Sequence, residues 1–210
     1  IFPSTYIHIG GDEAAKEHWK NCPKDQALMK KEGLKNEEEL QSYAIRQMDQ
    51  YLQSKGRKLL GWDEILEGGL SEGATVMSWR GEDGGIKAAN AGHDVIMTPG
   101  GYLYFDSYQT DPRTQPEAIG GYLPIEKVYS YDPVPTAISS DKAKHVLGAQ
   151  ANLWAEYMPT YQHVEYMAFP RALALSEIVW SKKEDKNWED FKARLQNHYK
   201  ILQQLEVNYY

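Results

Sequence analysis

Short apolar runs alternate with polar stretches along the chain, and each run ends in glycine, tryptophan or acidic residues. Runs that are apolar almost throughout are typical of parallel strands that are covered on both faces. Five of them are predicted to be strands: residues 5–11, 57–65, 74–81, 93–101 and 144–156. A helix is predicted over 36–56, ending at Gly56, because apolar residues recur there at helical spacing.

The remaining segments are predicted to connect these strands. A polar loop follows the first strand, a brief helix covers 84–93, and a long loop runs from about 100 to 140. Two helices, roughly 161–181 and 187–206, close the chain. Alternating strands and helices predict an α/β fold with a parallel sheet covered by helices.

Polar and aromatic residues gather at the carboxyl ends of the predicted strands. Active sites lie there in (β/α)8 barrels, and also in the crevice of doubly wound sheets. Neither a G-x-G-x-x-G nor a G-x-x-x-x-G-K-[ST] motif occurs, which counts against a nucleotide-binding sheet. A closed barrel needs eight strands. Either three strands escape the pattern or the chain lacks the first part of its barrel.

Composition narrows the class of protein. Of the 210 residues, 41% are hydrophobic and 25% are charged, which is an ordinary globular mixture. A formal charge of -7 argues against a nucleic-acid partner. No apolar run approaches the ~20 residues of a membrane span, and the single Cys22 excludes an internal disulfide framework. With 15 Tyr and 6 Trp against 4 Phe, the aromatic side chains suit a partly wet surface such as a sugar ring.

The stretch YIHIGGDEA places two acids, Asp12 and Glu13, just past the first predicted strand. One interpretation is a general acid with a neighbouring carboxylate; the other is a helix cap followed by a first-turn acid. Because adjacent residues of an extended strand point to opposite sides, a shared pocket requires a local twist. A metal site with His8 and a diguanylate cyclase GGDEF motif are weaker alternatives, because neither the spacing nor the context fits them.

Aromatic and acidic residues at the other strand ends favour a ligand pocket. A single such tryptophan is usually core packing, but three at equivalent ends of parallel strands would converge on one mouth. Indole faces and carboxylates suit a neutral polyhydroxylated ring. The candidate substrate-binding residues are Trp62, Trp79, Tyr104, Asp106, Trp154 and Glu156.

Five motifs in order, HIGGDEA, GWDEIL, VMSWRG, YLYFDSYQ and GAQANLWAE, resemble those of the family 20 glycoside hydrolases, the β-N-acetylhexosaminidases. The resemblance implies a (β/α)8 TIM barrel, of which this chain carries about strands 4 to 8. Residues 1–210 would then be the C-terminal part of a single catalytic domain. It also implies a retaining exo-hydrolase that removes terminal β-linked GlcNAc or GalNAc from glycans, with the substrate's own acetamido group as nucleophile. No metal or organic cofactor is implied, and the setting would be extracytoplasmic: periplasmic, secreted or lysosome-like.

The resemblance assigns a role to each candidate residue. Glu13 is similar to the general acid/base, and Asp12 to the carboxylate that orients the acetamido N–H. Trp62, Trp79 and Trp154 resemble the box around the acetamido group and sugar face. Tyr104 resembles the phenol that binds the acetamido oxygen, while Asp106 and Glu156 resemble acceptors for sugar hydroxyls.

The chain also departs from the family pattern. The family's sugar-binding arginine lies upstream of this chain, and Arg80 and Arg171 are expected to be structural ion-pair formers instead. Many members carry a further tryptophan in the loop 107–140, where this chain offers Tyr108, Tyr122, Tyr129 and Tyr131. Two rival hypotheses are a sugar-binding protein that has lost catalysis and a hydrolase of plain β-glucosides with two opposed carboxylates. The adjacent acids argue against both.

Overall fold

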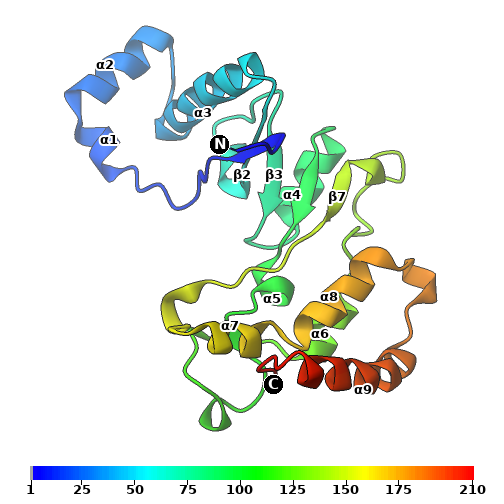
Figure 1. Cartoon of the computed structure of the whole chain (residues 1–210). Helices are drawn as coiled ribbons and strands as arrows, with labels where there is room; N and C mark the ends of the chain where they lie inside the picture. The colour runs from blue at the N-terminus through cyan, green and yellow to red at the C-terminus, as the bar shows by residue number, and fades with distance from the viewer. Residues whose placement is uncertain (1) are drawn as a thin grey trace. The chain divides into compact units, whose positions relative to one another are not determined.

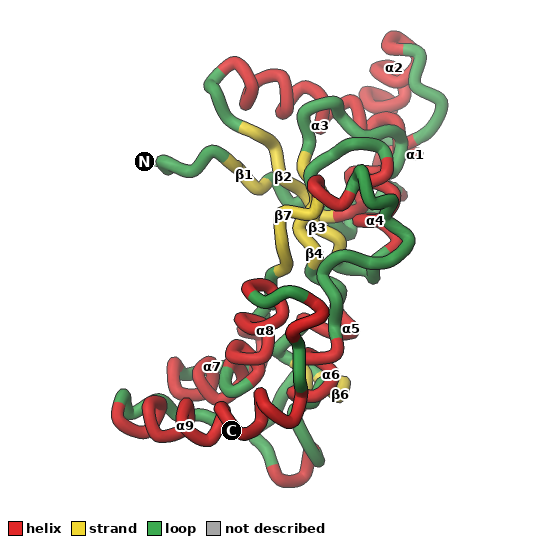
Figure 2. Tube along the Cα trace, turned by 90° about the vertical axis from the view of Figure 1, so that its right-hand side faces the viewer, coloured by secondary structure: helices red, strands yellow, loops and turns green. Residues whose placement is uncertain are grey.

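The five predicted strands are confirmed, and they form one sheet in chain order. The structure is a computed structural model that describes residues 2–210. The sheet contains β1 (Tyr6–His8), β2 (Lys58–Trp62), β3 (Thr75–Ser78), β4 (Val95–Met97) and β7 (Val146–Ala149). Strands β1 to β4 pair in parallel, with Tyr6 opposite Lys58 and Leu60 opposite Thr75. Figure 2 shows these strands in yellow.

The chain folds as two compact units, the first made of residues 2–97 and 136–147 and the second of residues 98–135 and 148–210. In the first unit, α3 packs against β2, and α4 packs against β3 and β4 (Figure 1). All four residues of β3 are buried, as expected for a central parallel strand covered on both faces. The helices and 3₁₀ turns of this unit are α1 (Glu17–Asn21), α2 (Pro23–Glu32), α3 (Glu37–Ser54), η1 (Asp63–Leu66), α4 (Asp83–Asn90) and η3 (Ala143–His145).

Helix α3 has the ends that its sequence predicts. The side chain of Asn36 accepts the N–H of Glu39 at 2.9 Å, and the Glu39 carboxylate accepts the N–H of Lys35 at 2.9 Å. This reciprocal cap satisfies amides that would otherwise lack partners at the helix start. Gly56, with a φ of 66°, follows the last turn in the left-handed conformation that glycine tolerates.

In the second unit, α6 and α7 both pack against α8. Tyr129, Trp188 and Phe191 form an aromatic cluster, with the rings of Tyr129 and Phe191 stacked at 4.7 Å. The elements of this unit are α5 (Gly100–Leu103), β5 (Ser107–Tyr108), η2 (Pro112–Thr114), β6 (Gly120–Tyr122), α6 (Ile125–Ser130), η4 (Ala155–Tyr157), α7 (Tyr161–Ala168), α8 (Arg171–Trp180), η5 (Lys183–Asp185) and α9 (Trp188–Gln204).

Some predicted connections were wrong. The polar loop after the first strand contains α1 and α2, and the loop 100–140 contains α5, α6 and the β5–β6 pair. The helix predicted over 161–181 is two helices, because Pro170 has no N–H to continue α7 and instead precedes α8. The fifth strand ends at Ala149, not at Trp154.

Candidate active site

A turn of two glycines carries Asp12 and Glu13 away from β1. Gly10 and Gly11 have φ values of 74° and 95°, and Glu13 is also left-handed at 49°. The backbone is therefore not extended at this turn. A Cβ on Gly11 would lie 2.6 Å from Cγ2 of Ile65, so a side chain does not fit at that position.

Hydrogen bonds from neighbouring elements hold this turn. The N–H of Trp62 donates to the carbonyl of Gly10 at 2.9 Å, and Nε2 of Gln41 donates to the carbonyl of Gly11 at 2.7 Å. Strand β2 and helix α3 thus both fix the position of the two acids. The side chains of Asp12 and Glu13 are exposed.

The alternatives for this stretch can now be compared with the structure. Helix α1 begins at Glu17 after Lys16, so Asp12 does not occupy a capping position. His8 makes a hydrogen bond at the end of β1, where its Nδ1 accepts the N–H of Gly10 at 3.0 Å. Partial burial lowers the pKa of His8, and the charge of Asp12 opposes that shift. Within residues 2–210, no group of three or more His, Cys, Asp or Glu residues could hold a metal ion.

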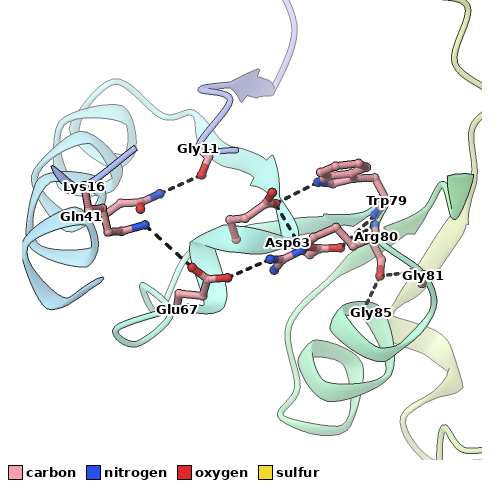
Figure 3. A network of polar contacts seen from close by, with 11 residues as sticks. Gly11, Lys16, Gln41, Asp63, Glu67, Trp79, Arg80, Gly81 and Gly85 are labelled. Carbon is pink, nitrogen blue, oxygen red and sulfur yellow. Dashed lines mark hydrogen bonds and ion pairs between the residues drawn. The ribbon is translucent and has the colours of Figure 1, made fainter. Parts of the chain in front are cut away.

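Trp62 and Trp79 pack in one cluster at the ends of β2 and β3. Trp62 is buried with Leu60 and Met77, and Trp79 packs against the same group. The turn after β3 is fixed at Ser78, whose hydroxyl donates to the carbonyl of Gly81 and accepts the N–H of Gly85, both at 2.8 Å. Figure 3 shows these contacts beside Trp79.

Two acids that the sequence analysis left without a role lie beside Trp79. Oδ2 of Asp63 accepts the backbone N–H groups of Trp79 and Arg80 at 3.0 and 3.2 Å, and Oδ1 accepts Nε of Arg80 at 2.5 Å (Figure 3). Oε2 of Glu64 accepts the indole N–H of Trp79 at 2.9 Å. The expectation that Arg80 forms structural ion pairs is therefore confirmed. The signal in the sequence was the pair of acids directly after Trp62.

A cavity of about 310 Å³ connects several of these residues. Glu13 and Trp79 both line it, so the structure brings the candidate acid/base and one candidate pocket tryptophan to the same space. The remaining lining residues are Ala14, Lys16, Gln41, Glu64, Glu67 and Arg80.

The second unit brings together Tyr104 and Trp154. Their rings lie 6.5 Å apart in an edge-on arrangement. The segments that carry them are joined at Asn152, which forms a parallel bridge with Tyr104. Asn152 accepts the N–H of Phe105 at 2.8 Å and donates its own N–H to Leu103 at 2.9 Å. This junction places Trp154 beyond the end of β7, and the sequence analysis did not identify Asn152.

Asp106 and Glu156 form the acidic part of this second group. Asp106 is only 5% exposed, and its Oδ1 has no hydrogen-bond partner among the described residues. Burial raises the pKa of Asp106, and the negative charge of Glu156 raises it further, against its backbone hydrogen bond and the charge of Arg171. A buried acceptor without a partner is suited to a ligand hydroxyl.

Arg171 holds the backbone around Asp106. Its guanidinium donates to four carbonyl oxygens, and Phe105 and Ser107, on either side of Asp106, supply two of them. Burial lowers the pKa of Arg171 to about 9, which leaves the side chain charged at neutral pH. Arg171 is therefore structural, as expected, but it binds carbonyls where an ion pair was predicted.

The four tyrosines of the loop 107–140 have different environments. Tyr129 and Tyr131 are buried, and the hydroxyl of Tyr108 accepts the N–H of Ala118 at 3.1 Å. Tyr122 is 62% exposed.

A parallel sheet with acids and tryptophans after its strands is typical of an α/β protein with a strand-end site. The chain belongs to glycosyl hydrolase family 20, because the profile of that family's catalytic domain matches residues 1–183. It forms a C-terminal portion of this TIM-barrel domain.

Relatives and solved structures agree with this membership. The chain is 56% identical over 211 residues to a beta-hexosaminidase of Porphyromonas gingivalis, and the match covers 100% of the chain and 27% of that relative. It is 36% identical to a beta-hexosaminidase of Vibrio furnissii, covering 84% of the chain and 29% of the relative. The chain thus spans less than a third of the length of either.

Among solved structures, a family 20 exo β-N-acetylglucosaminidase of Vibrio harveyi in complex with N-acetylglucosamine superimposes with a TM-score of 0.89 and 33% identity. That match covers 100% of this chain and 33% of the other. A β-N-acetylhexosaminidase of Bacteroides fragilis matches with a TM-score of 0.83 and 27% identity, covering 99% and 42% of the two chains.

Proposed function

We propose that the protein is a retaining exo-β-N-acetylhexosaminidase that removes terminal β-linked GlcNAc or GalNAc from glycans. The observation that carries the proposal is the adjacent pair Asp12 and Glu13, held on a Gly-Gly turn in a chain of family 20. Residues 1–210 would supply the C-terminal part of a single (β/α)8 catalytic domain.

In the first step, the acetamido oxygen of the substrate attacks C1 while the glycosidic bond breaks. Glu13 gives its proton to the departing oxygen, and Asp12 accepts a hydrogen bond from the acetamido N–H as positive charge develops. The product is an oxazolinium ion on the sugar. In the second step, Glu13 takes a proton from water, the water oxygen attacks C1, and the acetamide reforms with net retention.

The remaining candidate residues would bind the sugar. Trp62, Trp79 and Trp154 would enclose the acetamido group and the sugar face, and the Tyr104 hydroxyl would donate to the acetamido oxygen. Asp106 and Glu156 would accept sugar hydroxyls. The unpartnered Oδ1 of Asp106 supports its role, and the cavity that Trp79 lines together with Glu13 supports the role of Trp79.

The intact pair Asp12 and Glu13 argues against the binding-only alternative. A protein that only binds sugar has no need of a general acid beside a second carboxylate. Backbone conformation does not decide the matter, because Glu206 just after α9 is left-handed as well, with a φ of 57°.

An extracytoplasmic setting is part of the proposal, because terminal sugars of glycans are met there. Among the described residues, no helix has the length and apolarity needed to cross a membrane.

The test compares two aryl substrates in the full-length protein that carries this segment. We expect an aryl N-acetyl-β-glucosaminide to be hydrolysed far faster than the matching aryl β-glucoside, because only the first carries the nucleophile. Glu13→Gln should lower kcat by about 10²–10⁴-fold, the usual contribution of a general acid. Glu17→Gln, an exposed acid on α1, is the matched control and should leave kcat unchanged.

Equal rates on the two substrates would remove the acetamido nucleophile and the role of Asp12. Tight binding of N-acetylglucosamine without hydrolysis would favour the binding-only alternative. Adding the aryl N-acetyl-β-galactosaminide decides between the two sugar configurations.

A further inference from the structure

Glu64 is a buried carboxylate that the proposed mechanism does not use. It follows β2 within η1 and is 7% exposed. Its Oε2 accepts the indole N–H of Trp79 at 2.9 Å. An indole ring has a single N–H, so this bond fixes the free end of the Trp79 side chain.

The backbone of Trp79 is fixed by Asp63, the residue before Glu64. Asp63 accepts the backbone N–H of Trp79, so two successive acids anchor the backbone and the ring edge of one tryptophan. The ring then has little freedom to rotate about its side-chain torsions. The face that Trp79 presents is therefore set by η1 rather than by packing alone.

The surroundings of Glu64 are unfavourable for a carboxylate that only fills space. Burial raises the pKa of Glu64 and nearby Asp63 adds to it, whereas the indole N–H and Arg80 lower it. Nε of Arg80 lies 3.8 Å from Oε2 of Glu64. The hydrogen bonds of the Arg80 guanidinium go to Asp63 and Glu67, and Figure 3 shows both. An apolar side chain of similar volume would avoid this desolvation cost.

Glu64 and Trp79 also line the cavity that contains Glu13. Movement of the indole would change the shape of that space without any change in the acid/base itself. The hydrogen bond between Glu64 and Trp79 therefore helps to determine the size of the group that the cavity accepts beside Glu13.

We propose that Glu64 is a positioning residue which, through the indole N–H of Trp79, sets the size of the 2-acylamino group that the site accepts. This inference rests on the proposed function, in which Trp79 walls the acetamido group. It concerns the width of the pocket, whereas the chemical step belongs to Asp12 and Glu13.

The test measures kcat/KM for aryl β-glucosaminides that carry N-acetyl, N-propionyl or N-butyryl groups. Glu64→Gln keeps an oxygen acceptor for the indole, and Glu64→Leu removes it. Glu67→Gln is the matched control, because Glu67 also lines the cavity and accepts a hydrogen bond from Arg80, whereas the indole N–H of Trp79 donates to Glu64.

We expect Glu64→Leu to lower kcat/KM for the N-acetyl substrate about tenfold, the order of one hydrogen bond to a charged group. The ratio of N-propionyl to N-acetyl turnover should rise about tenfold, because a loosened wall admits the longer chain. Glu64→Gln and the Glu67→Gln control should keep this ratio within about twofold of the wild-type value. An unchanged ratio in Glu64→Leu would overturn the proposal, as would an equal change in Glu67→Gln.

Trp79→Phe supplies an independent arm, since phenylalanine lacks the indole N–H. It should shift the acyl ratio in the same direction, and adding Glu64→Leu to it should cause no further shift. Additive shifts would overturn the proposal. If Glu64→Leu does not fold, Trp79→Phe decides alone: an acyl ratio in Trp79→Phe that equals the wild-type ratio would overturn the proposal. A wild-type enzyme without preference for the acetamido sugar would refute the proposed function before any variant is compared.

Discussion

Replacing Arg171 should open the segment that carries Asp106. All five N–H groups of the guanidinium donate to backbone carbonyls, reaching Phe105, Ser107, Leu123 and Met167. Methionine has a similar length but no donor. Arg171→Met therefore leaves four carbonyl oxygens in the interior without this partner.

The expected cost follows from that count. A buried polar group left without a partner costs about 1–3 kcal/mol, so four carbonyls at the lower limit amount to about 4 kcal/mol. Total stabilities of about 5–15 kcal/mol make this a large fraction. Arg171→Lys retains the charge and three donors for four carbonyls, so at least one remains unpaired and the cost should be about 1–3 kcal/mol.

Hydrogen exchange of peptides from residues 104–123 measures this effect locally. A loss of about 4 kcal/mol corresponds to nearly a thousandfold faster exchange where opening is local. Arg194→Met is the matched control, because Arg194 is half-exposed and pairs with Glu177 and Asp190. Its loss should cost at most about 1 kcal/mol.

Protection in 104–123 that is the same in Arg171→Met as in the wild type would refute this reasoning. So would equal effects of Arg171→Met and Arg194→Met, because burial and the number of carbonyl partners would then not determine the cost.

Two further predictions concern Asp106 and Gly11. Because burial raises the pKa of Asp106 above its ordinary 3.8, the folded state holds this proton more tightly than the unfolded state. The free energy of unfolding should thus fall as pH rises from 3.8 through the folded-state pKa of Asp106. Urea titrations at several pH values measure this fall, which should be absent in Asp106→Asn. Identical pH dependence of the unfolding free energy in the wild type and in Asp106→Asn would contradict the prediction. Gly11→Ala should destabilise by about 1–3 kcal/mol more than Gly33→Ala in urea unfolding. Both positions have a positive φ, but only at Gly11 does the new methyl meet another side chain, so equal losses would contradict the steric argument.

The sheet could be predicted from the sequence because burial on both faces leaves a local record. Strands such as 95–97 are continuously apolar, and the capped helix after Asn36 repeats its apolar residues at helical spacing. Helix α2 left no such record, since Met29 is its only buried residue. Short elements such as α5 are below the length at which a period can be recognised.

The supporting residues of the site were hidden for a different reason. Arg171 and Phe105 lie 66 positions apart, and Thr98 and Asn152 lie 54 apart. Contacts at such separations leave no motif, because each partner satisfies a backbone or side-chain group that only the folded chain brings near. Glu64 lies two residues after a recognised tryptophan, Trp62, yet its partner Trp79 was set by the pairing of β2 with β3.

The left-handed backbone at Glu13 places the proposed acid/base role and stability in opposition at one residue. Glycine would relieve the strain at that position but would remove the acid. A laboratory selection for heat resistance alone would therefore favour loss of the proposed acid/base at this codon. A programme that improves this chain for industrial use should hold position 13 constant and seek its gains elsewhere.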